Sequence, residues 1–172
     1  MKEGRKGNVL FDPAYYFEQN PDLQAAGVNA YQHFMEFGMT EGRSPTPLFD
    51  CHFYTKAYQE VELSGLSSFE HFIKVGMQAD YQPNALFDPE FYAERYSDVK
   101  QSGTSAFVHF LRYGLAEGRQ PHPLFDSRFY VATYPDVVKS NLPPYIHFLQ
   151  YGMKEDRRPH PLFDPDFYRL TY

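Results

Sequence analysis

The spacing of apolar residues predicts that the chain is built from short helices. Four residues follow the i, i+3, i+4, i+7 spacing of one buried helix face: Tyr31, Phe34, Met35 and Gly38. Asn29 precedes them and is a good N-cap, so we expect a helix from there to about residue 37. We expect Gly38 to end it, and residues 39–47 to form a turn and an extended, proline-containing connector.

Start and stop residues predict two further helices before that segment. Asp12 precedes Pro13, and this pair favours a helix start because the carboxylate caps free N–H groups and proline suits the first helical position. This helix should reach about Gln19. The tripeptide Asn20-Pro21-Asp22 then interrupts it and begins a second short helix, which Gly27 closes in a left-handed conformation.

The same pattern returns at a constant interval, without insertion or deletion. The triplet Leu-Phe-Asp begins at Leu10, Leu48, Leu86, Leu124 and Leu162. The chain therefore divides into a preceding tail (1–9), four repeats (10–47, 48–85, 86–123 and 124–161) and the start of a further repeat (162–172). Helices this short are marginal alone in water, so neighbouring repeats must hold them. The prediction is an all-α fold of tandem short-helix repeats, stacked as one continuous α-solenoid-like array.

Both ends of the chain interrupt a repeat. Glu3-Gly4-Arg5 lies one repeat length before Glu41-Gly42-Arg43, and the final repeat stops at Tyr172 soon after it begins. We expect that the chain is a piece of a longer array, and that its open ends fray or associate end to end with another copy.

Composition and charge narrow the classes of partner. The chain has 17 Phe, 15 Tyr and no Trp, which favours layers filled by large rings. A net charge of −6 without a long run of Lys or Arg argues against nucleic acid. No segment approaches the roughly 18 apolar residues of a membrane span, and the N-terminal sequence is not a secretory signal. The single cysteine, Cys51, cannot form an intramolecular disulfide.

Each repeat carries one His-Phe pair, and the imidazoles belong to His33, His71, His109 and His147. Successive pairs are a full repeat step apart, on the order of 10 Å for packed helices, which is too far to share a metal ion. We interpret these imidazoles as partly buried and bonded to a backbone carbonyl or to the next repeat's Asp. Structural roles, as helix caps and helix ends, are also expected for Asp12, Asp50, Asp88, Asp126, Gly38, Gly76, Gly114 and Gly152.

A row of tyrosines is the first set of candidate ligand-binding residues: Tyr16, Tyr54, Tyr92 and Tyr130. Another aromatic residue precedes each one: Tyr15, Phe53, Phe91 and Phe129. Adjacent helical residues diverge by about 100°, so only one of each pair can point squarely into the core. We expect the mainly Phe companions there and the Tyr hydroxyls at the rim. The tyrosines then either complete the packing, which we favour, or stack on sugar rings.

The arginines of the Glu-Gly-Arg turns are the second set of candidate ligand-binding residues: Arg43, Arg119 and Arg157. In the second repeat Ala79 and Tyr81 replace both charges together, so the two charges serve each other or a shared neighbour, such as the helix-capping Asp. Repeat-specific recognition would instead reside at variable, solvent-facing positions. One such position is occupied by Ala14, His52, Glu90, Arg128 and Asp166.

The complete motif runs Phe-Asp-Pro-x-Phe/Tyr-Tyr, Pro-Asp-Val/Leu, His-Phe, Tyr-Gly and Glu-Gly-Arg-x-Pro. It resembles bacterial repeats that accompany glycosyltransferases of capsule, rhamnan and O-antigen synthesis, and that occur in some large calcium-binding surface proteins. The resemblance covers residues 3–172. The second repeat departs from the motif at Cys51, Ala79 and Tyr81, and the fourth at Ser127 and Asn141.

The resemblance implies a non-catalytic accessory module of a bacterial glycan-assembly protein, in the cytoplasm or at the membrane periphery. Such a module would bind or guide a polysaccharide, or act as a spacer. The alternative is a protein–protein interaction scaffold of a bacterial surface or multidomain protein. No glycine-rich phosphate loop, His-Glu-x-x-His or Gly-x-Ser-x-Gly motif occurs, so we expect neither an enzyme nor a cofactor.

Overall fold

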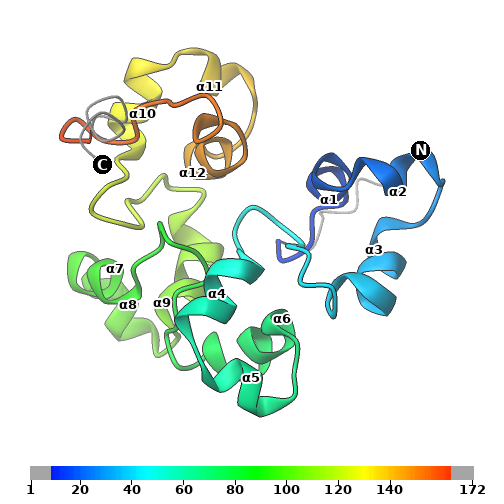
Figure 1. Cartoon of the computed structure of the whole chain (residues 1–172). Helices are drawn as coiled ribbons and strands as arrows, with labels where there is room; N and C mark the ends of the chain where they lie inside the picture. The colour runs from blue at the N-terminus through cyan, green and yellow to red at the C-terminus, as the bar shows by residue number, and fades with distance from the viewer. Residues whose placement is uncertain (1–8, 164–172) are drawn as a thin grey trace, which may run out of the picture. The chain divides into compact units, whose positions relative to one another are not determined.

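A computed structural model describes residues 9–163 and divides the chain into two compact units, residues 1–74 and 75–172. The regular elements of the described part are short helices (Figure 1), and its only β pairing consists of two isolated bridges, Thr46–Phe49 and His122–Phe125. The prediction of an all-α chain is confirmed. Most of the expected tail of a preceding repeat (1–8) and most of the further repeat (164–172) lie outside the described residues.

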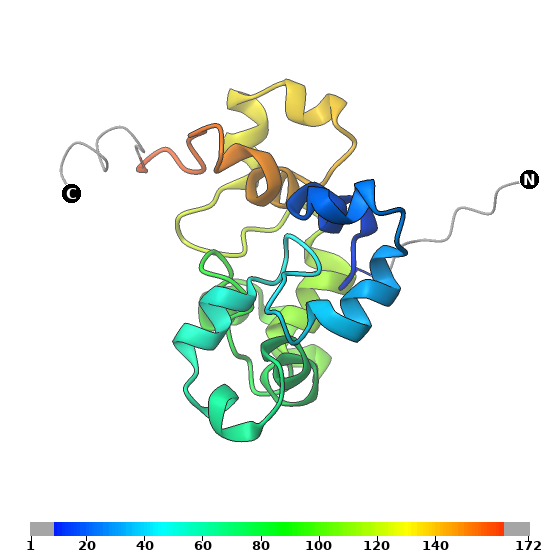
Figure 2. The ribbon, with the colours of Figure 1, turned by 45° about the vertical axis from the view of Figure 1, so that its right-hand side comes forward.

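Unit 1 contains the first repeat and most of the second. Its helices are α1 (Pro13–Gln19), α2 (Pro21–Ala25), α3 (Ala30–His33), η1 (Phe34–Gly38), α4 (Cys51–Ala57), α5 (Glu60–Ser64) and α6 (Ser68–His71). A further π-helical turn, η2 (Phe72–Gly76), follows α6 and contains the unit boundary. The light-blue α3 continues directly into η1 (Figure 2).

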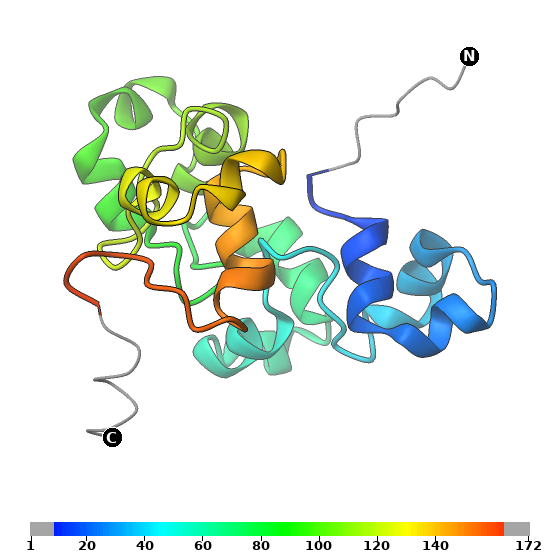
Figure 3. The same cartoon turned by 90° about the horizontal axis from the view of Figure 1, so that it is seen from above.

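Unit 2 contains the third and fourth repeats. Its helices are α7 (Pro89–Arg95), α8 (Ser97–Ser102), α9 (Ala106–His109), η3 (Phe110–Gly114), α10 (Ser127–Thr133), α11 (Asp136–Lys139), α12 (Pro144–His147) and η4 (Phe148–Gly152). The orange α12 and η4 together form one rod (Figure 3). The first helices of the repeats, α1, α4, α7 and α10, begin at equivalent positions, one repeat length apart.

In the four described repeats, the aspartate of the Leu-Phe-Asp triplet caps the first helix, as predicted. Asp12 Oδ1 accepts hydrogen bonds from the N–H groups of Ala14 and Tyr15. Asp126 likewise accepts from Arg128 and Phe129, whereas Asp50 and Asp88 each accept one such bond, from Phe53 and Phe91. The Asp12 N–H also donates to the Pro45 carbonyl at 2.9 Å, so the start of the repeat pairs with its end. In the third and fourth repeats, the N–H groups of Asp88 and Asp126 donate in the same way to the carbonyls of Pro121 and Pro159.

The third helix of each repeat ends in a π-helical turn, which changes the face predicted from the sequence. The Met39 N–H donates to the Phe34 carbonyl, five residues back, at 2.9 Å. This extra residue per turn rotates the chain, so Phe34 and Gly38 are buried while Met35 is exposed. Tyr31, in the preceding α3, is exposed as well. The expectation that all four share a buried face was wrong.

Gly38 has a packing role rather than the conformational role that was expected of it. Gly38 is the last residue of η1, as predicted, but its backbone is not left-handed, and the left-handed residue is Gly42, with φ of 70°, in the turn that follows. A Cβ on Gly38 would come within 3.0 Å of the Tyr16 hydroxyl. Gly114 and Gly152 lie equally close to the hydroxyls of Tyr92 and Tyr130. Glycine is required here because a phenol end occupies the space of a side chain.

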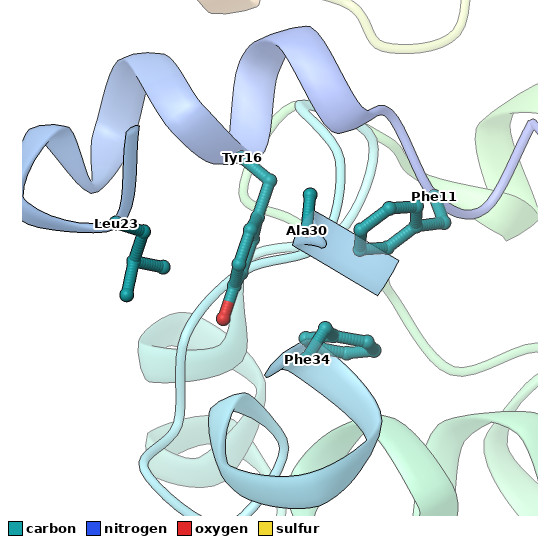
Figure 4. Packing of buried hydrophobic residues seen from close by; sticks show 5 residues of the cluster. All are labelled: Phe11, Tyr16, Leu23, Ala30 and Phe34. Carbon is teal, nitrogen blue, oxygen red and sulfur yellow. The ribbon is translucent and has the colours of Figure 1, made fainter. Parts of the chain in front are cut away.

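Rings fill the core of each repeat. In the first repeat, Tyr16 packs against Phe34 edge to face, with ring centroids 5.7 Å apart, and Phe11 completes the layer. Leu23 and Ala30 close its sides (Figure 4). The four tyrosines at this position are fully buried, whereas their aromatic companions are only half-buried. The expectation that the companions fill the core was therefore wrong.

Within each unit one ring bridges two consecutive repeats. In unit 1, Phe69 lies 5.3 Å from the Phe49 ring of its own repeat and 5.3 Å from the Phe34 ring of the preceding repeat. In unit 2, the Tyr145 ring makes the equivalent contacts with Phe125 at 5.3 Å and Phe110 at 5.5 Å. The cores of neighbouring repeats are thus joined through an aromatic side chain.

Over residues 9–163, every helix is too short or too polar to cross a membrane.

Candidate ligand-binding surfaces

A buried tyrosine supports the histidine of the same repeat. The hydroxyl of Tyr92 lies 3.2 Å from Nδ1 of His109, and that of Tyr130 lies 3.0 Å from Nδ1 of His147. Burial raises the pKa of Tyr130, so its phenol stays protonated and forms a hydrogen bond with the imidazole. The imidazoles are buried or half-buried, as expected, but the predicted partners were wrong. Each Nδ1 bonds a hydroxyl that lies 17 residues earlier in the same repeat.

The tyrosines proposed as sugar-stacking residues are not at the surface. Tyr16, Tyr54, Tyr92 and Tyr130 have 0% of their surface exposed. Their hydroxyls point inward, onto the imidazole and the glycine of the π turn, because the ring crosses the layer from the first helix to the third. The expectation that these hydroxyls reach the rim was wrong, and the rings offer no surface to a ligand.

A different aromatic position reaches the surface, fully or in part, beside each histidine of the first, third and fourth repeats. Phe37 packs on His33 with centroids 5.5 Å apart and is 52% exposed. Tyr113 packs on His109 at 5.1 Å and is 50% exposed. Tyr151, half-buried, packs on His147 at 5.5 Å. Val75 takes this place in the second repeat.

Residue 37 was not predicted as a site residue, because the buried face of this helix was assigned to Tyr31, Phe34, Met35 and Gly38. Phe37 lies beside His33, four residues earlier, and its ring is tilted by 48° against the imidazole and about half exposed. The recurring aromatic residue before glycine in the motif was the available signal.

Polar side chains surround the exposed ring of the first repeat. A shallow pocket of about 190 Å³ is lined by Phe37, His33, Asn29, Gln32, Glu36 and Val28. Gln32 Nε2 donates to Glu36 Oε1 at 2.9 Å, which fixes an amide and a carboxylate next to the ring. An apolar ring face beside hydrogen-bonding groups can hold a molecule that is apolar on its faces and polar at its edges.

The arginines of the Glu-Gly-Arg turns are engaged in ion pairs. Arg119 donates to both carboxylate oxygens of Asp98, at 2.8 and 2.7 Å, and to Glu117 at 2.5 Å. Arg157 binds Asp136 and Glu155 in the same way. The prediction that the two charges of the turn serve each other is confirmed. The suggested shared neighbour was wrong, because it is the aspartate of the second helix and not the capping aspartate.

Arg43 makes a variant of this cluster in the first repeat. It donates to Glu41 at 2.6 Å and to the Asn20 side-chain carbonyl at 2.6 Å, while Asp22 lies 3.8 Å away. In the third and fourth repeats the arginine also lies over a tyrosine ring, Tyr96 or Tyr134, at 4.8 Å. These guanidinium groups hold the turn against the second helix, and any ligand would have to compete with carboxylates for them.

The buried imidazole of His147 predicts a loss of stability in mild acid. Burial, followed by the nearby Arg157, lowers the pKa of His147 below its usual value. Burial also lowers the pKa of His122. Between pH 7 and 5 the unfolded chain gains protons that the folded chain resists, so stability is full above about pH 6.5 and falls below it. The urea midpoint should therefore be lower at pH 5 than at pH 7.

The variant His147→Gln tests this assignment, with His52→Gln, at an exposed position, as the matched control. His147→Gln should reduce the change in midpoint between the two pH values, and His52→Gln should leave it as in the native chain. An unchanged pH dependence in His147→Gln would contradict the assignment.

Cys51 is a buried thiol near the end of the first repeat's connector. Burial raises the pKa of Cys51 to about 11, and its Sγ donates to the Arg43 carbonyl, so the thiol stays protonated. Within residues 9–163, no three His, Cys, Asp or Glu side chains cluster as metal ligands would.

No family model matches the chain, and no curated protein or solved structure matches it significantly.

Proposed function

We propose that the chain is a non-catalytic array of stacked helical repeats that binds a polysaccharide in a bacterial glycan-assembly protein. The observation that carries the proposal is the exposed ring packed on a supported histidine, at Phe37, Tyr113 and Tyr151. The C–H face of a sugar can pack on such a ring while its hydroxyls bond neighbouring polar groups. Rings at the same position in three of the four repeats suit a polymer whose units also repeat.

Stacking of the repeats is supported by the bridging ring. Phe69 and Tyr145 each join the core of their own repeat to that of the preceding one. Tyr31 has the same place in the first described repeat and is 53% exposed. We infer that each repeat buries this ring of its successor, which is how a solenoid gains stability from interfaces.

The histidine on which each of these rings packs is itself held by a hydrogen bond, and this favours a binding role. His109 is held by the Tyr92 hydroxyl on one nitrogen, and its Nε2 lies 3.5 Å from Asp98. A ring packed on an imidazole fixed at both nitrogens loses little conformational freedom when a ligand stacks on it. This preorganisation would favour glycan binding without any catalytic group.

The proposal is tested by glycan-array binding of the purified chain and its variants. Tyr113→Ala and Phe37→Ala should each lower the signal about five- to tenfold, since loss of a ring contact costs on the order of 1 kcal/mol. Leu63→Ala, at a side chain that is 89% exposed, serves as the matched control and should leave the signal unchanged. Thermal midpoints of the variants should match that of the native chain.

The alternative of a protein–protein scaffold has its own observation, the exposed Tyr31 and Met35 of α3 and η1. It predicts that the native chain binds no glycan on the array and that Tyr113→Ala changes nothing. Absence of any glycan signal from the native chain would sink the polysaccharide proposal.

A further inference from the structure

A polar pocket of about 570 Å³ lies within unit 2, where the third repeat meets the first residues of the fourth. Its lining includes Arg95, Tyr96, Glu117, Arg119, Ser127 and Arg128. The volume falls in the range of pockets that hold small ligands. The lining is rich in charged side chains, so a suitable ligand must be polar.

Two arginines of the pocket lining, Arg95 and Arg128, take no part in an ion pair with the described residues. Arg119 pairs with Asp98 and Glu117, and the Asp126 carboxylate accepts the capping hydrogen bonds of α10. Arg95 and Arg128 have exposed side chains, and neither pairs with a carboxylate within residues 9–163. Arg95 lies over the rings of Phe91 and Tyr96, at 5.8 and 6.0 Å. Two guanidinium groups are therefore available to an anion.

A buried hydroxyl in the pocket also lacks a partner. Ser127 is 5% exposed, and its Oγ makes no hydrogen bond with the described residues. At the equivalent position of the second repeat, Cys51 donates its thiol hydrogen to the Arg43 carbonyl. Buried polar side chains normally have a partner, and one in a pocket lining can take a ligand atom as its partner.

Arginine occupies both positions at one junction only. The residues equivalent to Arg95 and Arg128 are Gln19 and His52, Ala57 and Glu90, and Thr133 and Asp166 at the other junctions. The repeat architecture forms without this pair of charges elsewhere, so the pair is not required for packing. Its presence at one junction indicates a local function.

We propose that this pocket binds a sugar unit that carries an anionic group, either a carboxylate or a phosphate. The guanidinium groups of Arg95 and Arg128 hold the anion, since their planar N–H groups match its oxygens, and the Ser127 hydroxyl bonds the sugar or the anion. The inference rests on the proposed polysaccharide binding and adds to it an anionic class of ligand. The site is separate from the exposed rings packed on the histidines.

The test measures amide chemical shifts and affinity of the full chain with glucuronate, glucose 6-phosphate, glucose and inorganic phosphate. Glucuronate or glucose 6-phosphate should shift the amides of Arg95, Gln120 and Arg128 saturably, and the better of the two identifies the anionic group. Glucose should bind at least tenfold more weakly, as expected when charge-assisted hydrogen bonds are lost. Equal binding of glucose, or no binding of either anionic sugar, would overturn the proposal.

Variants locate the site. Arg128→Gln and Arg95→Gln should each weaken binding about tenfold. Arg112→Gln, an exposed arginine of η3 outside the lining, is the matched control and should bind as the native chain does. Ser127→Ala should weaken binding without lowering the thermal midpoint, because it removes an unpaired buried hydroxyl. Native affinity in both arginine variants would refute the site.

Two further outcomes distinguish the assignment to a sugar from the assignment to an anion, and this site from the proposed polysaccharide binding. Inorganic phosphate that binds as tightly as glucose 6-phosphate would overturn the assignment to a sugar. Neutral glycans that bind through Tyr113 while no anionic sugar binds here would overturn this inference and leave the proposed function standing.

Discussion

Replacing Gly152 with alanine should lower the free energy of unfolding by about 2–3 kcal/mol, because overpacking and a broken buried hydrogen bond act together. The new Cβ would come within 3.0 Å of the Tyr130 hydroxyl and of the Phe148 ring. Tyr130 would have to move, and it would then lose its bond to His147 Nδ1. Urea unfolding followed by circular dichroism measures the change.

The variant Tyr130→Phe provides the control, because it removes the oxygen that the Cβ meets. Alone it should cost about 1 kcal/mol, the usual value of one lost hydrogen bond. Combined with Gly152→Ala it should cost less than the sum of the two single changes, with a coupling of about 1 kcal/mol. Full recovery is not expected, since the Phe148 ring stays close. Strictly additive costs would show that the hydroxyl and the glycine do not meet.

Replacing Tyr145 with alanine should lower the free energy of unfolding by about 3–5 kcal/mol, as expected for removal of a large ring from a core. Tyr145 is buried between the Phe110 and Phe125 rings of two consecutive repeats. Its hydroxyl donates to the side-chain carbonyl of Asn84 at 3.0 Å, so the variant also removes a hydrogen bond from a buried amide. Denaturant titration of the variant and the native chain gives the value.

Tyr31→Ala is the matched control, since Tyr31 has the same place in the first described repeat but is mostly exposed. It retains one edge-to-face contact with Phe11 at 5.2 Å, so its removal should cost less than about 1 kcal/mol. Equal effects of Tyr31→Ala and Tyr145→Ala would contradict the inference that each repeat buries this ring of its successor.

The sequence by itself predicted the local starts and stops of the helices. Asp12 followed by Pro13 predicted α1, and Gly27 adopts the expected left-handed conformation, with φ of 66°. Gly65, Gly103 and Asn141 occupy the same left-handed position in later repeats. These features depend on backbone hydrogen bonds and steric limits within a few residues, so a local reading of the chain is enough.

The sequence also predicted that Glu117 and Arg119 pair, but it could not find their third partner. Asp98 lies 21 residues before Arg119, and it meets the guanidinium only when the second helix folds back beside the turn. Likewise, the charges of Arg95 and Arg128 are visible in the sequence, while their place on one pocket required the tertiary structure.

The choice between adjacent rings shows most clearly what could not be predicted from the sequence alone. Tyr15 and Tyr16 differ little in chemistry, and the helical period states only that they point apart. Tyr16 is the buried one because the π turn leaves a glycine and an imidazole where its hydroxyl ends. The constant repeat length and the helix ends could thus be read from the chain itself, because they depend on local chemistry. The inward ring, the exposed ring and the pocket depended on side chains that are distant in sequence and that only the folded chain brings together.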